Sequence, residues 1–272
     1  MSNSHQQFLQ DGFYQHSEPV IPAELVQRAV EGMEMIRRGE YDTGNPPYES
    51  PWNPGDSDDV LCKIEMPILA NKAIMELASH PALAKLAAEV ADAEMIQVWW
   101  VQLLRKPTTP DGGSLQTNVG MHQDFFYWQN HWDDNSELFT AWVAVSDVTP
   151  EAGSMHFVRG SHNWGLGEDS DFFGQDLSEQ KAAIASRTGD EWDEVASSLR
   201  PGGVSFHHCL TYHGSGPNTS GAPRLGFAIH MRTEKSQTKK GRRDGLTEFI
   251  DNEVANPIVF GDRMPESLPA SK

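Results

Sequence analysis

The sequence is poor in cysteine and contains no long apolar run. Its only two cysteines, Cys62 and Cys209, have neither zinc-binding nor redox-active spacing, so we expect two free thiols. No apolar run approaches the roughly 20 residues that a membrane-spanning helix requires. The polar residues 1–7 lack the basic and apolar regions of a signal peptide. We therefore expect a cytoplasmic protein without a membrane partner.

Basic residues are scarce as well. The 272 residues include 21 Lys and Arg against 39 Asp and Glu, which gives a net charge of −18. Nucleic-acid binding needs clustered cations that replace counterions, so we expect no nucleic-acid partner. The same field disfavours strongly anionic substrates.

The pattern of apolar residues changes from helical to extended along the chain. An amphipathic helix is predicted after Pro22, and two more at about 67–79 and 81–91. The proline-rich segment 42–59 predicts a loop, long enough to cover part of a functional site. Strands dominate from about residue 94.

This order predicts one domain, 1–272, of mainly β structure with helical decoration, large enough for a β-sandwich or jelly-roll. We expect four parts, namely an N-terminal helical part at about 1–92, a β core at about 94–232, an insertion within it at about 165–201, and a C-terminal extension at 233–272.

The insertion is predicted to carry two short helices. Asp176 and Glu179 have the spacing of a capping box, which predicts a helix that begins there. A second helix is predicted from Trp192 to Leu199.

The triplet His122-Gln123-Asp124 is the first candidate for a metal site. If the triplet lies on a strand, His122 and Asp124 project from the same face, where an imidazole and a carboxylate can share one metal. A histidine from a distant strand would complete the two-histidine, one-carboxylate set of non-haem Fe(II) oxygenases. The triplet alone is a weak signal, because about one such match is expected by chance.

Two rival triplets have the same spacing. His131-Trp132-Asp133 lies among turn-forming residues, which gives no strand to align its side chains. His16-Ser17-Glu18 lies near prolines in a segment where a solvated loop is expected. Both are weaker candidates than His122 and Asp124.

The third ligand is expected from the segment 203–213. If this run is one regular strand, His207 and His213 share a face and His208 points the other way. We favour His213, because it precedes the turn-forming residues 214–218 and functional side chains concentrate at strand ends.

The segment 223–231 alternates strictly between two faces. Arg224 heads a lane of small residues that continues through Gly226, Ala228 and His230. Its guanidinium could hold a carboxylate through two parallel hydrogen bonds. The alternative is a surface arginine in an ordinary ion pair.

Four blocks between about residues 8 and 232 resemble, in the same order, the phytanoyl-CoA dioxygenase family of Fe(II)/2-oxoglutarate oxygenases. They are Phe8–Phe13, His122–Trp128, Ala141–Ser154 with Gly160–His162, and His213–Ser215 with Asn218 and Arg224. The resemblance implies a double-stranded β-helix core, the jelly-roll of cupin-like proteins. It also implies that the insertion at 165–201 is a lid near the mouth of this core.

The resemblance assigns roles to five residues. It implies that Arg224 binds the far carboxylate of 2-oxoglutarate and that Ser215 adds a hydroxyl to it. The implied iron ligands are His122, Asp124 and His213.

The resemblance also indicates candidates around the cosubstrate and substrate. Gln102 is the candidate for the metal-proximal end of 2-oxoglutarate, although Trp100 falls where relatives often carry glutamine. Three aromatic residues are candidates for the substrate pocket, with burial in the core as the alternative. They are Trp142, Phe126 and Trp128.

The implied cofactors are Fe(II), 2-oxoglutarate as cosubstrate and O2, and the implied reaction hydroxylates a small molecule with release of succinate and CO2. Relatives that halogenate carry a small residue in place of Asp124, so hydroxylation is expected, with desaturation or ring closure as alternatives. A metal-binding, cupin-like isomerase or a non-catalytic binding protein is the alternative class, but it would not explain Arg224. The sequence fixes neither the substrate nor the oligomeric state.

Overall fold

The computed structural model describes residues 2–109, 117–189 and 191–262, which fold around two antiparallel sheets. The larger sheet has seven strands in the order β1-β8-β5-β10-β3-β11, with β2 also paired to β3. Its strands are β1 Phe13–Gln15, β2 Cys62–Glu65, β3 Ile96–Lys106, β5 Leu138–Ala144, β8 Val204–His208, β10 Arg224–Thr233 and β11 Ile258–Phe260. The smaller sheet has the order β4-β9-β6-β7. Its strands are β4 Val119–His122, β6 Met155–Val158, β7 Glu194–Ser197 and β9 His213–Ser215.

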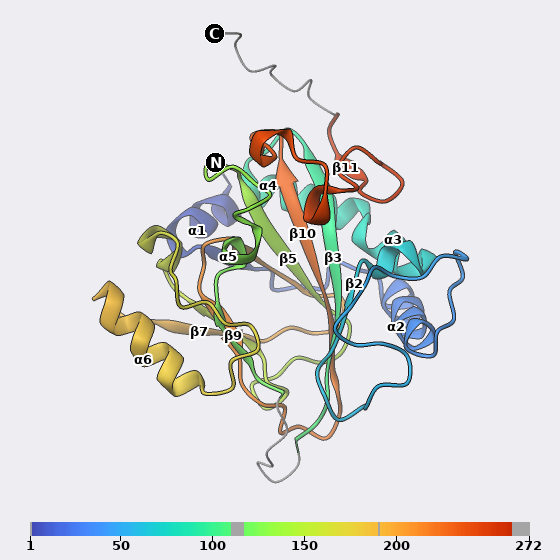
Figure 1. Ribbon diagram of the computed structural model, residues 1–272, viewed down its shortest axis with the longest axis horizontal. Coiled ribbons are helices and arrows are strands. Elements are labelled where there is room, and N and C mark those ends of the chain that lie inside the picture. The colour runs from blue at the N-terminus through green and yellow to red at the C-terminus, as the bar shows by residue number, and fades with distance from the viewer. Residues whose placement is uncertain (1, 110–116, 190, 263–272) are drawn as a thin grey trace.

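This arrangement is the predicted jelly-roll with helical decoration, although the described strands form two sheets and do not close into a barrel. Figure 1 shows α2 and α3 on the opposite side of β3 and β10 from β7, β9 and α6. The longer helices are α1 Asn3–Asp11, α2 Ala23–Arg37, α3 Lys72–Ala78, α4 Pro81–Ala91, α5 Asp124–Trp128 and α6 Leu177–Thr188. Short 3-10 helices are η1 Pro67–Leu69, η3 Ser161–Trp164, η4 Lys239–Gly241 and η5 Gly245–Thr247.

Two helices of the N-terminal part, α2 and α4, begin where the sequence predicts them. The predicted helix at about 67–79 is divided into η1 and α3, and α1 was not predicted. Pro22 directly precedes α2, and Pro81 occupies the first turn of α4, where a missing N–H costs nothing. The Asn71 side chain caps α3 by accepting from two backbone N–H groups. Segment 42–59 contains no helix or strand, as predicted. Within the described ranges, no helix has the length and apolarity to cross a bilayer.

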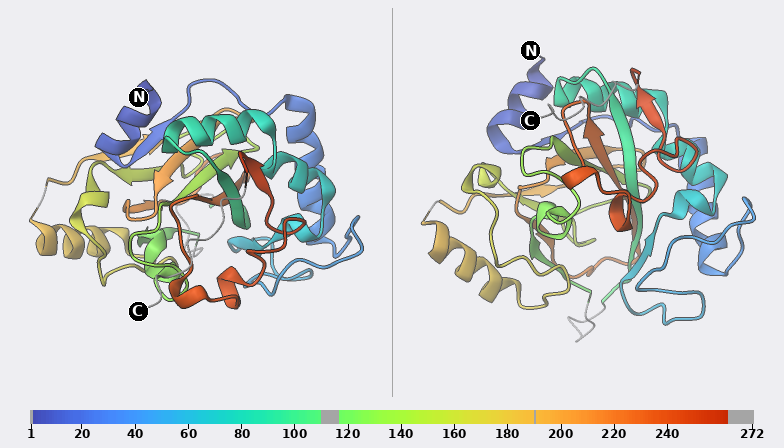
Figure 2. Two further views of the ribbon diagram at one scale, coloured as in Figure 1. Left: turned by 90° about the horizontal axis from the view of Figure 1, so that it is seen from above. Right: turned by 45° about the horizontal axis from the view of Figure 1, so that its top comes forward.

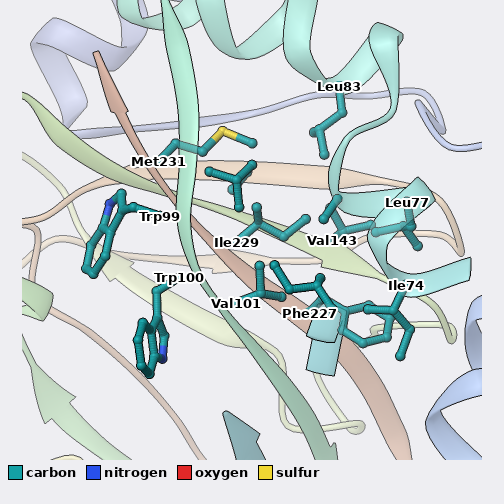
Figure 3. Packing of buried hydrophobic residues seen from close by; sticks show 14 of the residues in the cluster. Ile74, Leu77, Leu83, Trp99, Trp100, Val101, Val143, Phe227, Ile229 and Met231 are labelled. Atoms are coloured by element: carbon teal, nitrogen blue, oxygen red, sulfur yellow. The ribbon is translucent and has the colours of Figure 1, made fainter. Parts of the chain in front are cut away.

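The main core lies between the larger sheet and the helices α3 and α4. Figure 3 shows Val101, Ile229 and Phe227 on the strands facing Ile74 and the neighbouring helical side chains. Figure 2 shows α4 lying across the end of the same strands. Burial of each such side chain contributes roughly 1.5–3 kcal/mol to the free energy of folding. This layer therefore stabilises the sheet, whose other face carries the polar site.

A β-bulge interrupts β3 where it pairs with β10. The register pairs Trp100 with His230 but Val98 with Met231, so Trp99 is an extra residue. Trp99 and Trp100 therefore lie on the same side of β3, away from Val101 (Figure 3). The bulge changes the alternation that a regular strand would give, and it directs two adjacent indoles toward α5 and the site.

The insertion at 165–201 is partly helical, as predicted. The Asp176 side chain accepts from the N–H of Glu179 at 2.9 Å and caps α6. The second predicted helix, from Trp192 to Leu199, is wrong. The segment forms β7, because pairing with the edge of β6 outweighs its weak helical pattern.

The N-terminal part and the C-terminal extension contribute more strands than their sequence patterns suggest. The strands β1 and β2 come from the expected helical part, and β11 comes from the expected C-terminal extension. All three join the larger sheet. Cys62 and Cys209 are buried and free, as predicted.

Candidate metal centre and cosubstrate cavity

Three side chains from distant parts of the sequence converge at one point between the sheets. One potential ligand atom from each of His122, Asp124 and His213 lies within 4.8 Å of the others. Both Nε2 atoms lie 3.7 Å from Oδ1 of Asp124. The three residues are only 3%, 7% and 4% exposed. Two imidazole nitrogens and one carboxylate oxygen form the donor set that suits Fe(II) with open positions.

The local structure of the triplet differs from the prediction. The strand β4 ends at His122, and Asp124 begins the helix α5, so the two do not alternate along one strand. Gln123 fixes this junction, since its amide donates to the carbonyls of Gly165 at 2.9 Å and Leu210 at 2.7 Å. The side chains meet because the backbone turns sharply between strand and helix.

His213 also arrives by a different route. The run 203–213 is not one strand, because β8 ends at His208 and β9 begins at His213 in the other sheet. His213 therefore begins a strand instead of ending one, and it pairs directly opposite His122. Cross-strand neighbours have adjacent side chains, which explains how the two imidazoles approach one another.

Backbone carbonyls orient both imidazoles. The Nδ1 atom of His122 lies 2.8 Å from Gly120 O, and that of His213 lies 2.9 Å from Thr211 O. A carbonyl oxygen can only accept, so each Nδ1 carries the proton and each Nε2 keeps its lone pair for a metal. Burial lowers the pKa of His213 well below its usual value, helped by His122 and His207, so the ring is neutral.

The carboxylate of Asp124 is held on one oxygen only. Oδ2 accepts from Thr140 Oγ1 at 2.7 Å and lies 3.2 Å from His207 Nε2. Because Thr140 donates its proton to Asp124, its oxygen is left to accept from His230 Nδ1 at 2.8 Å. Burial raises the pKa of Asp124, but His213, His122 and His207 together lower it well below its usual range. Oδ1 remains as an ionised oxygen facing the two Nε2 atoms.

A cavity that we call the inner cavity extends from the metal-site residues into the space between the sheets. Its wall includes Arg224, Ser215, Trp142, Gln102, Thr140 and His207. Arg224 is 3% exposed, which excludes the alternative of a surface arginine. Its guanidinium donates to Gly153 O and lies 5.3 Å from the Trp142 ring centroid, and its Nε has no partner. Burial lowers the pKa of Arg224 to about 10.

The predicted lane on β10 is confirmed. Arg224, Ala228 and His230 line the inner cavity, and a Cβ on Gly226 would lie 2.3 Å from the Trp142 ring. The absence of a side chain at Gly226 thus makes room for the indole that supports the guanidinium.

A second cavity of about 200 Å³, here the outer cavity, adjoins the metal-site residues. Its wall includes Tyr127, Trp128, Phe172, Phe173, Trp100 and the Lys63–Glu65 ion pair, whose N–O distance is 2.9 Å. Gln102 lines both cavities.

The predicted aromatic residues are distributed unevenly between the two cavities. Trp128 lines the outer cavity and Trp142 the inner one, whereas Phe126 lines neither. The insertion at 165–201 contributes Phe172 and Phe173 to the walls, but no residue of segment 42–59 does. The lid motion of the insertion stays a prediction.

The rival triplets do not form a comparable site. In the part of the chain that the structure describes, the cluster of potential ligands consists of His122, Asp124 and His213. His131 and Asp133 flank a single β-bridge residue within turns, and residues 16–18 are partly or fully exposed.

Several site residues were not identified from the sequence. Thr140 and His230 hold the carboxylate network, and His207 was considered only as a rival ligand. Lys106 was also overlooked, because its burial and its hydrogen bonds to Ser215 and Gly216 appear only in the fold. These roles depend on contacts between strands far apart in sequence.

Comparisons with known proteins agree with this geometry. The chain is 26% identical over 283 residues to the probable alpha-ketoglutarate-dependent hypophosphite dioxygenase of Stutzerimonas stutzeri, covering 96% of this chain and 94% of that one. Its fold is similar to that of SnoN, the non-heme alpha ketoglutarate dependent epimerase from nogalamycin biosynthesis, with a TM-score of 0.66, 22% identity and coverage of 98% and 94%. The carbocyclase SnoK from nogalamycin biosynthesis gives a TM-score of 0.64 at 23% identity, with coverage of 90% and 89%.

The sequence profile of the family described as Phytanoyl-CoA dioxygenase (PhyH) matches residues 8–226, close to the extent of the resemblance seen in the sequence. The chain therefore belongs to the phytanoyl-CoA dioxygenase (PhyH) family and is a non-haem iron dioxygenase that depends on Fe(II), 2-oxoglutarate and O2.

Proposed function

We propose that the protein hydroxylates a C–H bond of a small molecule, with Fe(II) held by His122, Asp124 and His213. The observation that carries this proposal is the convergence of three potential ligand atoms. The other polar atoms of the same three side chains already have hydrogen-bond partners. When bound, the iron and 2-oxoglutarate supply the oxidising power, with succinate and CO2 as the by-products.

Arg224 and Ser215 anchor the far carboxylate of 2-oxoglutarate in this proposal. Both line the inner cavity with the metal-site residues, and the unpartnered Nε of Arg224 supports a role in anion binding. Gln102 lies between the two cavities, where it can contact the metal-proximal end of the cosubstrate. The residues present therefore fit iron at one point and a dicarboxylic acid beside it.

The substrate binds in the outer cavity. This cavity adjoins His122 and Asp124, and its aromatic walls favour an apolar body over a large hydrated one. The Lys63–Glu65 ion pair adds both signs of charge to the same wall. A small molecule with an apolar part and a polar group suits these walls better than a bulky polyanion, which the net charge of −18 also repels.

An anaerobic titration tests the assignment of the cosubstrate site. Fe(II) and 2-oxoglutarate added to the protein without O2 should give a weak visible charge-transfer band. Arg224→Ala should raise the Kd for 2-oxoglutarate by about 100-fold, because removing one partner of a buried charge pair costs about 2–5 kcal/mol. Arg28→Ala, which removes an exposed arginine on α2, is the matched control. Full cosubstrate affinity in Arg224→Ala would count against the proposal.

A substrate screen tests the reaction itself. Small molecules are compared for their stimulation of succinate release, and the products of those that stimulate it are identified. A product that gains one oxygen atom supports hydroxylation. An epimer or a cyclised product would assign this chain to one of the outcomes named for SnoN and SnoK instead.

A further inference from the structure

A buried lysine lies behind the inner cavity. Lys106 is the last residue of β3 and pairs with Arg224 of β10. It is 0% exposed, and its Nζ lies 2.6 Å from Ser215 Oγ, 3.2 Å from Ser215 O and 2.5 Å from Gly216 O. The ammonium group thus directs its three N–H bonds at one short segment of β9 and the residue that follows.

Neither buried cation has an acidic partner in the described ranges. No carboxylate there lies within ion-pair distance of Lys106 or Arg224. Burial lowers the pKa of Lys106 well below its usual value, and the nearby charge of Arg224 lowers it further. Two adjacent buried cations are costly to a fold, so the arrangement favours a site that receives an anion.

The hydrogen-bond chemistry of lysine fixes the role of Ser215. Lys106 Nζ donates to Ser215 Oγ at 2.6 Å, so this oxygen is the acceptor of that hydrogen bond. The hydroxyl hydrogen of Ser215 is then free to point elsewhere. Ser215 lines the inner cavity together with Arg224, whereas Lys106 does not line it. The free hydrogen is therefore available to an acceptor in that cavity.

We propose that Lys106 is a positioning residue that makes Ser215 a hydrogen-bond donor to the far carboxylate of the cosubstrate, so that the cavity selects a dicarboxylic 2-oxo acid over a monocarboxylic one. This inference rests on the proposed function. Lys106 acts in two ways, because it orients the hydroxyl and adds a second positive charge next to Arg224. It does not itself contact the cosubstrate.

The test compares two ligands that differ only at the far end. 2-Oxopentanoate has the carbon chain of 2-oxoglutarate with a methyl group in place of the far carboxylate. Both are titrated anaerobically with Fe(II), and the charge-transfer band reports binding. Lys106→Met should raise the Kd for 2-oxoglutarate by about 10–100-fold, the size of effect that loss of an outer-shell partner typically has. The Kd for 2-oxopentanoate should change by less than about 3-fold. Lys85→Met, on the exposed side of α4, is the matched control.

A double-mutant cycle separates orientation of the hydroxyl from general damage. Ser215→Ala should weaken 2-oxoglutarate selectively, and adding Lys106→Met to it should have a smaller effect than Lys106→Met alone. If Lys106→Met does not fold, Lys106→Gln takes its place in the same titrations and in the same cycle, with the same selective loss expected. Equal weakening of both ligands, or no weakening of 2-oxoglutarate, overturns the inference.

The same titration distinguishes this inference from the proposed function. A wild-type protein that binds Fe(II) but no 2-oxoglutarate would sink the proposed function. A wild-type protein that binds 2-oxoglutarate, combined with variants that lose no selectivity, would sink only the role of Lys106.

Discussion

The inner and outer cavities share the metal-site residues but differ in how much of their walls lies on strands. The inner cavity is walled by strand residues of both sheets, among them Arg224 of β10, Ser215 of β9 and Trp142 of β5. The outer cavity takes much of its wall from the short helix α5, the 3-10 helix η5 and the segment before α6. The segment before α6 is joined to α5 by a hydrogen bond from Phe172 N to the Tyr127 hydroxyl at 2.7 Å.

This difference separates the binding of the cosubstrate, which is common to the family, from the selection of the substrate. A cosubstrate shared by a whole family can be bound by groups fixed in sheets, where packing holds each side chain in place. Specificity for a substrate is more readily changed on loops and short helices, which tolerate substitution. We therefore expect changes in the inner cavity to alter iron or 2-oxoglutarate binding, and changes at residues that line only the outer cavity to leave both intact.

Removal of the carboxylate ligand should have the largest effect. Asp124→Ala takes away one of three ligands, so metal affinity should fall by well over the ~100-fold that outer-shell changes typically cost. Calorimetric titration with Co(II) under anaerobic conditions measures it. Asp133→Ala, from the rival triplet, serves as the control and should bind metal normally. Equal losses in the two variants would contradict the assignment of the metal site.

Removal of the Thr140 hydroxyl, which donates to that carboxylate, should have the next largest effect on metal affinity. Thr140→Val keeps the shape of the side chain but removes the 2.7 Å bond to Asp124 Oδ2 and the acceptor of His230. Metal affinity should fall by about 10–100-fold, and Thr140→Ser should restore most of it. Unchanged Co(II) affinity in Thr140→Val would show that the ligand oxygen needs no such support.

A methyl group added at Gly226 should have a moderate effect on stability and on 2-oxoglutarate binding. In Gly226→Ala the new Cβ would lie 2.3 Å from Trp142, so the indole under Arg224 must move. Such overpacking costs about 1–3 kcal/mol of unfolding free energy. The Kd for 2-oxoglutarate should rise with it. Gly221→Ala, where nothing lies within 4 Å of the new Cβ, is the control for both denaturant unfolding and titration.

A change in the outer cavity should have the smallest effect on cofactor binding. Phe173 is 59% exposed and lines only the outer cavity. In Phe173→Ala, affinities for metal and 2-oxoglutarate should stay within about 2-fold of wild type, as for most surface substitutions. Substrate-stimulated succinate release should nevertheless show a raised KM, and Phe260→Ala should not. Cofactor affinities that fall as far as in Thr140→Val would remove the distinction between the two cavities.

The parts of the site that sequence reasoning located are those with a local signature. The triplet at His122, the turn after His213 and the alternation that begins at Arg224 each stand out within a few residues, and the structure brings them together. The jelly-roll class followed from the same blocks through the family resemblance. Helices with clear start signals, such as α2 and α4, were also located closely.

The errors arise where distant parts of the chain decide the structure. The break between His122 and Asp124, the change of sheet between His208 and His213, and the bulge at Trp99 each depend on strand pairing that no local pattern encodes. The same holds for β7, which forms a strand because β6 offers an edge. Lys106 was missed for a related reason, since its role depends on the pairing of β3 with β10 and on hydrogen bonds from its side chain to Ser215 and Gly216.

The proposed cosubstrate site beside the two buried cations would tie the persistence of the protein to the supply of 2-oxoglutarate. Lys106 and Arg224 lie together without an acidic neighbour in the described ranges, so a bound dianion relieves their repulsion and favours the folded state. A ligand present at 100 times its Kd adds about 2.7 kcal/mol to folding. Where proteolysis acts on transiently unfolded molecules, cells depleted of 2-oxoglutarate should degrade this protein faster.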